Sequence, residues 1–202
     1  MAKFKPGDAT DLALCAALKH EYLRCSDAFE EFRHVAEKMI MQGEDRRIAF
    51  RTYNAYARFI HHLYEFLLAA TQRDRNDTAQ LDHELADKYI HGIAQRVLNK
   101  RREAILNGTA PAWENHISAF PEHVPQDFAS RFRRVRNTAL GHAKPERHRL
   151  SLTTFYHEFH KFLYMIYVDS MWMWGRVDDD FPDLGEITAF SVMIKDDPAL
   201  ST

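Results

Sequence analysis

Apolar residues recur every three or four positions along most of the chain, and this spacing limits the possible folds more than any other feature. Such a period is typical of helices that bury one face. With only seven Gly and seven Pro in 202 residues, the chain is poor in the turns that a β-sandwich needs. We therefore expect an all-α fold, an up-and-down bundle of four to five long helices with a short acidic C-terminal tail. The clearest helix carries Tyr56, Phe59, Ile60, Leu63, Phe66, Leu67 and Ala70.

Capping residues and helix breakers predict where the helices begin and end. The segment from Thr10 to about Met41 is expected to form one long helix, or two joined near Ser26, and residues 109–124 an irregular flap over the bundle. Trp113 and Phe120 in this flap are candidates for stacking on bases. A helix is expected to begin at Pro125, which suits the first helical position. The predicted N-caps are Thr10, Asp45, Asp77 and Ser151, and the predicted ends are Gly43, Asn107-Gly108, Gly141 and Gly175.

Length and composition fit a single domain with a tail. Residues 1–175 are expected to form the bundle. Residues 176–202, with seven acidic side chains against two basic ones, are expected to form the tail. This tail is either a solvated, partly ordered terminus or a segment that folds back on a basic groove. The Met171–Trp174 run is apolar around more than one face, which favours a subunit interface or a seat for the tail.

The sequence excludes several classes of protein. Two cysteines, Cys15 and Cys25, cannot build a disulfide framework, so reduced thiols in a cytoplasmic protein are expected. The start of the chain lacks an apolar signal region, and the most apolar run, Phe162–Trp174, is interrupted by Asp169 and is too short to span a bilayer. We therefore expect no membrane partner.

Basic side chains are concentrated between Arg131 and Arg149, which hold seven Arg or Lys against one Glu in a chain of net charge −2. Arg136 lies on one shoulder of the apolar stripe of this predicted helix, and His142 lies on the other shoulder if the helix continues. A cation near a titratable imidazole at the edge of a core suits a phosphate group. The stripe consists of Phe128, Phe132, Val135 and Ala139.

The segment Arg136-Asn137-Thr-Ala-Leu-Gly-His142 resembles the motif of the HEPN superfamily, an Arg followed after four to six residues by a His, in an all-helical domain. Asn137 directly after the Arg, Gly141 before the His and Pro145 after it strengthen the likeness. Of the branches of this superfamily, the abortive-infection and plasmid-borne ones are the candidates. The likeness covers the motif closely and the bundle loosely.

The resemblance implies a metal-independent endoribonuclease, a toxin or phage-defence effector restrained by an antitoxin or regulatory protein. Arg136 and His142 would be catalytic, Asn137 would orient the Arg or the substrate, and no cofactor would be needed. Members of the family usually join two motifs across a two-fold dimer, so a homodimer is expected. The predicted RNA-binding residues are Arg131, Arg133, Arg134, Lys144, Arg147 and Arg149.

Other interpretations remain open. The chain could be a non-enzymatic dimerisation or nucleotide-binding module, in which His142 is structural and Arg136 pairs with a carboxylate of a neighbouring helix. It could also be a scaffold that binds protein through the Met171–Trp174 run. A metal site at His157 and His160 is not expected, because no Cys or carboxylate joins them at a recognisable metal-binding spacing.

Overall fold

The computed structural model describes residues 3–43, 45–114, 116–141, 147, 149–171, 173 and 185–195. Within these ranges the chain is helical and has no β-strand, which confirms the all-α prediction; one isolated antiparallel bridge joins Lys3 and Asp77. The α-helices are α1 (Ala9–Gln42), α2 (Arg46–Asp74), α3 (His83–Leu106), α4 (Phe128–Arg136), α5 (Leu152–Ser170) and α6 (Glu186–Lys195). Two 3-10 turns, η1 (Ala112–Glu114) and η2 (Ile117–Ala119), and one π-helical turn, η3 (Asn137–Gly141), complete the secondary structure.

The first two helices form a long hairpin. Helix α1 continues through Ser26 without a break and ends before Gly43. The φ of Gly43 is 88°, a positive value that glycine adopts readily and that residues with a side chain disfavour. Asp45 then caps α2 by accepting a hydrogen bond from the backbone N of Arg47, as predicted. The predicted cap at Thr10 was wrong, because the Asp8 side chain accepts the bonds that cap α1.

The start of the third helix was also predicted wrongly. The side chain of Asp77 accepts a bond from the backbone N of Ala79 at 2.9 Å, within the connection. The helix starts at His83, where Asp82 caps it by accepting a bond from the backbone N of Leu85 at 2.8 Å. Two Asp residues in one connection compete for the cap, and only Asp82 lies where the apolar period resumes.

Helix α4 begins at Phe128, three residues after the predicted start at Pro125. Pro125 instead begins a turn, in which its carbonyl oxygen accepts a hydrogen bond from the backbone N of Phe128. The predicted cap of α5 at Ser151 is confirmed, since its hydroxyl oxygen accepts a bond from the backbone N of Thr154 at 3.2 Å. Helix α5 ends at Ser170, and the predicted end at Gly175 lies outside the described residues.

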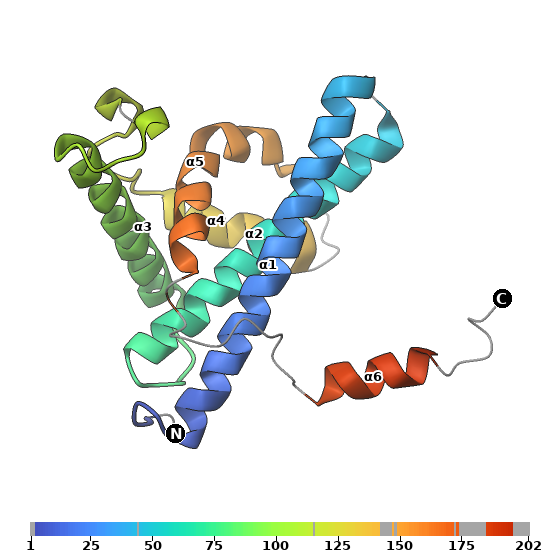
Figure 1. Ribbon diagram of the computed structural model, residues 1–202, viewed down its shortest axis with the longest axis vertical. Helices are drawn as coiled ribbons and strands as arrows, with labels where there is room; N and C mark the ends of the chain where they lie inside the picture. The colour runs from blue at the N-terminus through green and yellow to red at the C-terminus, as the bar shows by residue number, and fades with distance from the viewer. Residues whose placement is uncertain are drawn as a thin grey trace.

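The helices α1 and α2 lie side by side and antiparallel, and α3, α4 and α5 pack on one side of this hairpin (Figure 1). The short α4 contacts α2, α3 and α5, so its apolar face is enclosed on several sides. The predicted stripe is buried, and phenylalanines are the largest fully buried side chains of the core. Fully buried phenylalanines come from three helices: Phe59, Phe66, Phe128, Phe132, Phe155, Phe159 and Phe162.

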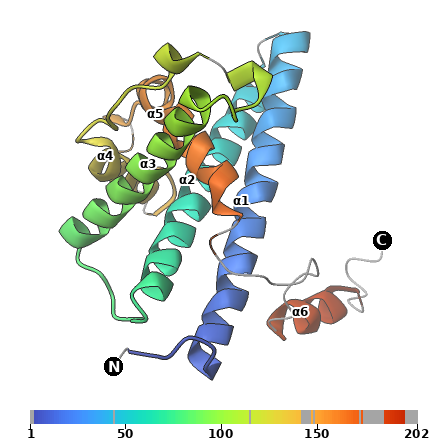
Figure 2. The ribbon, with the colours of Figure 1, turned by 60° about the vertical axis from the view of Figure 1, so that its left-hand side comes forward.

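Two segments lie at the edges of the bundle. The flap contains η1 and η2; Trp113 is 82% exposed, whereas Phe120 packs against the core. Helix α6 lies to one side of the hairpin in both views (Figures 1 and 2), and residues 176–184 and 196–202 of the predicted tail lie outside the described ranges. Among the described residues, no helix combines the length and the apolar character that crossing a bilayer requires.

Candidate active site

The Arg-Asn pair of the motif lies where the helical geometry changes. Arg136 is the last residue of α4, and Asn137 is the first residue of the π-helical turn η3, which ends at Gly141. The predicted helix end near Gly141 therefore corresponds to the end of a wider turn. Buried Val135 and Ala139 anchor this junction in the core. Isolated π-helical turns within helices are rare and often occur at functional sites.

The Arg136 side chain is held by three neighbours. Its Nη1 donates a hydrogen bond to Oδ1 of Asn137 at 2.7 Å, and its Nη2 forms an ion pair with Glu65 of α2. The guanidinium carbon lies 5.5 Å from the ring centroid of Tyr64. The Nε atom is buried and has no hydrogen-bond partner in the described part of the chain. Arg136 is thus fixed in direction.

These side chains line a groove of about 600 Å³ between α2, α4 and the connection that leads into α3. Arg133, one turn before Arg136, is fixed by two 2.9 Å hydrogen bonds to the carboxylate of Asp87. The groove therefore presents two oriented guanidinium groups together with amide and carboxylate oxygens. Its polar lining is Glu65, Gln72, Gln80, Asp82, His83, Arg133, Arg136 and Asn137.

A histidine pair of α2 lies near this ion pair. Burial lowers the pKa of His61, and the charge of Arg136 lowers it further while the charge of Glu65 opposes the shift. The Nδ1 of His61 is buried without a hydrogen-bond partner in the described residues, whereas Nδ1 of His62 lies 2.6 Å from Oε1 of Glu21. His61 is thus neutral at neutral pH. Its protonated form would interact with the charges of Arg136 and Glu65.

The second half of the motif is not described. His142, Lys144 and Pro145 lie outside the described residues, so the structure gives no position for the predicted catalytic His or for one predicted RNA-binding Lys. The Met171–Trp174 run is described at only two positions. Of these, Met171 is exposed and Met173 packs against the core.

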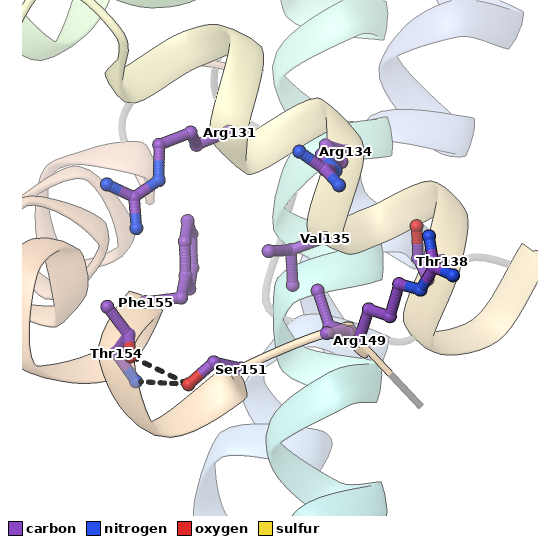
Figure 3. A pocket seen from close by; sticks show the side chains of 9 residues that line it. Arg131, Arg134, Val135, Thr138, Arg149, Ser151, Thr154 and Phe155 are labelled. Atoms are coloured by element: carbon purple, nitrogen blue, oxygen red, sulfur yellow. Dashed lines mark hydrogen bonds between the residues drawn. The ribbon is translucent and has the colours of Figure 1, made fainter. Parts of the chain in front are cut away.

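The predicted RNA-binding arginines do not form one surface. Arg133 lines the Arg136 groove, whereas Arg131, Arg134 and Arg149 line a second pocket (Figure 3). Arg147 is exposed, and its Nε donates a hydrogen bond to the carbonyl oxygen of Thr138 at 3.1 Å. Helix α4 thus separates two sets of basic side chains, because positions three or four apart share a helix face.

The histidines of α5 have other surroundings. His160 is hydrogen-bonded through Nδ1 to the hydroxyl of Tyr56 at 3.0 Å, stacks on Tyr156, and has a pKa lowered by burial to about 4. His157 on the same helix is exposed. Within the described ranges, no three His, Cys, Asp or Glu side chains are close enough together to hold a metal ion.

Sequence reasoning did not find the residues of α2 that hold Arg136. Tyr64 and Glu65 precede Arg136 by about 70 positions, and no motif links them. The nearest unusual sequence feature is the pair His61-His62, which lies just before Tyr64 and Glu65 on α2.

No protein-family model matches the chain, and neither curated proteins nor solved structures give a significant match. Function must therefore be argued from the site itself, because a helical bundle hosts many activities.

Proposed function

We propose that this protein is a HEPN-like, metal-independent endoribonuclease that acts as a toxin or phage-defence effector. The observation that carries the proposal is the bonded Arg136-Asn137 pair, which lines a groove at the junction of α4 and η3. A guanidinium fixed in direction, whose Nη1 and Nη2 each carry a second N–H besides the one already paired, suits a phosphate whose charge increases during reaction.

Each residue has a defined role in the proposed reaction. His142 removes the proton from a ribose 2′-hydroxyl, and the 2′-oxygen then forms a bond to phosphorus. Arg136 donates hydrogen bonds to the phosphorane oxygens, where negative charge develops. The bond from phosphorus to the 5′-oxygen breaks, and the leaving oxygen takes up a proton from an imidazolium. The products are a 2′,3′-cyclic phosphate and a 5′-hydroxyl end.

A dimer supplies the groups that one chain lacks. Two-fold symmetry would place two copies of the motif face to face, so one imidazole could act as base and the other as acid. The basic side chains would bind backbone phosphates with little reading of sequence, and binding would weaken with added salt. An antitoxin or regulatory protein would restrain the activity.

A second candidate is a non-catalytic module that binds nucleic acid or a nucleotide. The ion pair between Arg136 and Glu65 favours it, since the carboxylate already occupies part of the guanidinium. In this case Arg136 ties α4 to α2, and binding depends on the other arginines.

Incubating purified protein with a labelled structured RNA in EDTA tests the proposal. Wild-type protein should cleave the RNA, and Arg136→Ala should reduce the rate by about 10²- to 10³-fold, the usual cost of losing one donor to a developing charge. His142→Ala should be similarly impaired. A matched control is Arg33→Ala, which removes an exposed arginine that pairs with Glu30 on α1.

The outcomes separate the two candidates. Cleavage at the wild-type rate by Arg136→Ala would refute the catalytic assignment. Salt-sensitive binding of RNA without cleavage by any variant would favour the non-catalytic module. Equal melting temperatures across the variants would show that lost activity does not reflect lost folding.

A further inference from the structure

A second basic pocket lies between α4 and the start of α5, on a different face of α4 from the Arg136 groove. Its volume is about 270 Å³, and Figure 3 shows Arg131 and Arg134 extending from α4 and Arg149 extending from the segment before α5. The other lining residues are Val135, Thr138, Leu150, Ser151, Thr154 and Phe155.

The three arginines differ in how their charge is balanced. Arg131 pairs with Glu158 and Asp127, and its guanidinium carbon lies 4.7 Å from the ring centroid of Phe159. Arg134 and Arg149 are exposed and form no ion pair or hydrogen bond within the described parts of the chain. None of the lining residues is acidic. Among the residues that the structure describes, the pocket therefore holds two arginines whose charge no carboxylate compensates.

The remaining walls offer both polar and apolar contacts. Ser151 and Thr154 form a hydroxyl pair 2.7 Å apart at the beginning of α5, where the helix dipole adds positive potential. Thr138 contributes a third hydroxyl group on the side of η3. The apolar lining residues are Val135, Leu150 and Phe155, of which Leu150 is half-buried and provides carbon surface beside the polar groups. Such a wall suits an anion attached to a carbon skeleton.

We propose that this pocket binds a dianionic phosphate monoester, as carried by a nucleotide or by the 5′ end of a nucleic acid. Two uncompensated cations match a dianion, whereas an internal phosphodiester carries one charge and would leave one cation unbalanced. The volume lies just below the range of about 300–1,000 Å³ for drug-sized ligands, so it admits a phosphate with its sugar and excludes a duplex. The proposed ligand would bind three arginines of the predicted RNA-binding set, Arg131, Arg134 and Arg149, so the inference rests on the proposed function.

The test compares two forms of a short 2′-O-methyl ribo-oligonucleotide, one with a 5′-phosphate and one with a 5′-hydroxyl. The 2′-O-methyl group prevents cleavage through the 2′-oxygen, so binding is measured whether or not the protein is a nuclease. By fluorescence anisotropy, wild-type protein should bind the phosphorylated form at least about tenfold more tightly. Equal affinities for the two forms would overturn the inference.

Two double variants test whether the preference for the 5′-phosphate arises from this pocket. Arg134→Ala/Arg149→Ala should abolish the preference for the 5′-phosphate. The matched control is Arg46→Ala/Arg47→Ala, which removes two exposed arginines at the start of α2 and should keep it. A preference that survives in Arg134→Ala/Arg149→Ala would overturn the inference, as would its loss in the control.

Two further arms identify the source and the charge of the ligand. Displacement of the oligonucleotide by AMP would support a free nucleotide as the ligand, and retention of the 5′-phosphate preference without displacement would support a nucleic-acid end. The preference should decrease below about pH 6, because the monoester then loses its second charge. A preference unchanged at pH 5 would contradict recognition of a dianion.

Discussion

At the scale of single residues, Glu65 controls how available Arg136 is to an anion. Its carboxylate pairs with the guanidinium, and the two side chains are about one-third exposed, at 32% and 28%. An incoming phosphate must therefore compete with Glu65 for the guanidinium, because the unpaired Nε of Arg136 is buried. The ion pair contributes little to stability at this exposure, because water screens it.

Glu65→Gln should therefore increase the affinity for RNA by a few-fold while changing the free energy of unfolding by less than about 1 kcal/mol. Anisotropy titrations and urea unfolding measure the two effects. Glu31→Gln is the control, since Glu31 pairs with Arg58 and Arg51 elsewhere on the hairpin. Weaker RNA binding by Glu65→Gln would instead show that Glu65 positions Arg136 for its ligand.

His160 makes the stability of the bundle depend on pH. Its folded-state pKa of about 4 is below the unfolded value of about 6.5, so between these values the unfolded chain binds more protons. Stability should therefore decrease as pH falls from 6.5 to 4. Burial lowers the pKa values of His61 and His20 as well, and both act in the same direction.

His160→Phe should keep the aromatic stack and flatten this dependence. Urea unfolding at several pH values between 4 and 6.5 measures the slope. His157→Phe, which replaces an exposed histidine on the same helix, should leave the slope unchanged. An equally steep slope in His160→Phe would show that other groups cause the acid sensitivity.

At the scale of helices, periodicity identified the elements and local chemistry decided their ends. The apolar repeat of α2 predicted that helix closely, because consecutive turns each add the same burial signal. The caps of α1 and α3 were missed where several capping residues lay within a few positions. The path of the preceding connection decides which capping residue accepts hydrogen bonds from the first turn. The apolar period carries no information about that path.

The start of α3 gives a direct check on this point. Asp82→Ala should lower the free energy of unfolding by about 1 kcal/mol, the usual cost of losing an N-cap, and Asp82→Ser should restore most of it. Asp77→Ala, which changes the N-cap predicted from the sequence, should lower the free energy of unfolding by a smaller amount. If chemical denaturation gave a larger loss for Asp77→Ala than for Asp82→Ala, the helix would begin at Asp77.

At the scale of the whole molecule, the sequence predicted an all-helical fold but not which helices meet. The contact between Glu65 and Arg136 depends on the register of α4 against α2, which side-chain packing sets. The packing of α4 against α5 brings Arg149 into one pocket with Arg131 and Arg134. The arginines predicted as one RNA-binding set are therefore divided between two faces of α4.

The proposed composite active site requires a second copy of the chain. Light scattering should give twice the monomer mass at the concentration where the protein cleaves RNA. Without RNA, the Arg136→Ala variant should also be a dimer if Arg136 acts in catalysis and not in assembly. A monodisperse monomer with full activity would contradict the two-motif mechanism.

The most direct measurement of the central claim is the chemical identity of the RNA ends after incubation in EDTA. Mass spectrometry should find 2′,3′-cyclic phosphate and 5′-hydroxyl ends with wild-type protein and almost none with Arg136→Ala. Ends with a 3′-hydroxyl and a 5′-phosphate, or the same products from Arg136→Ala, would contradict an Arg136-dependent attack by the 2′-hydroxyl.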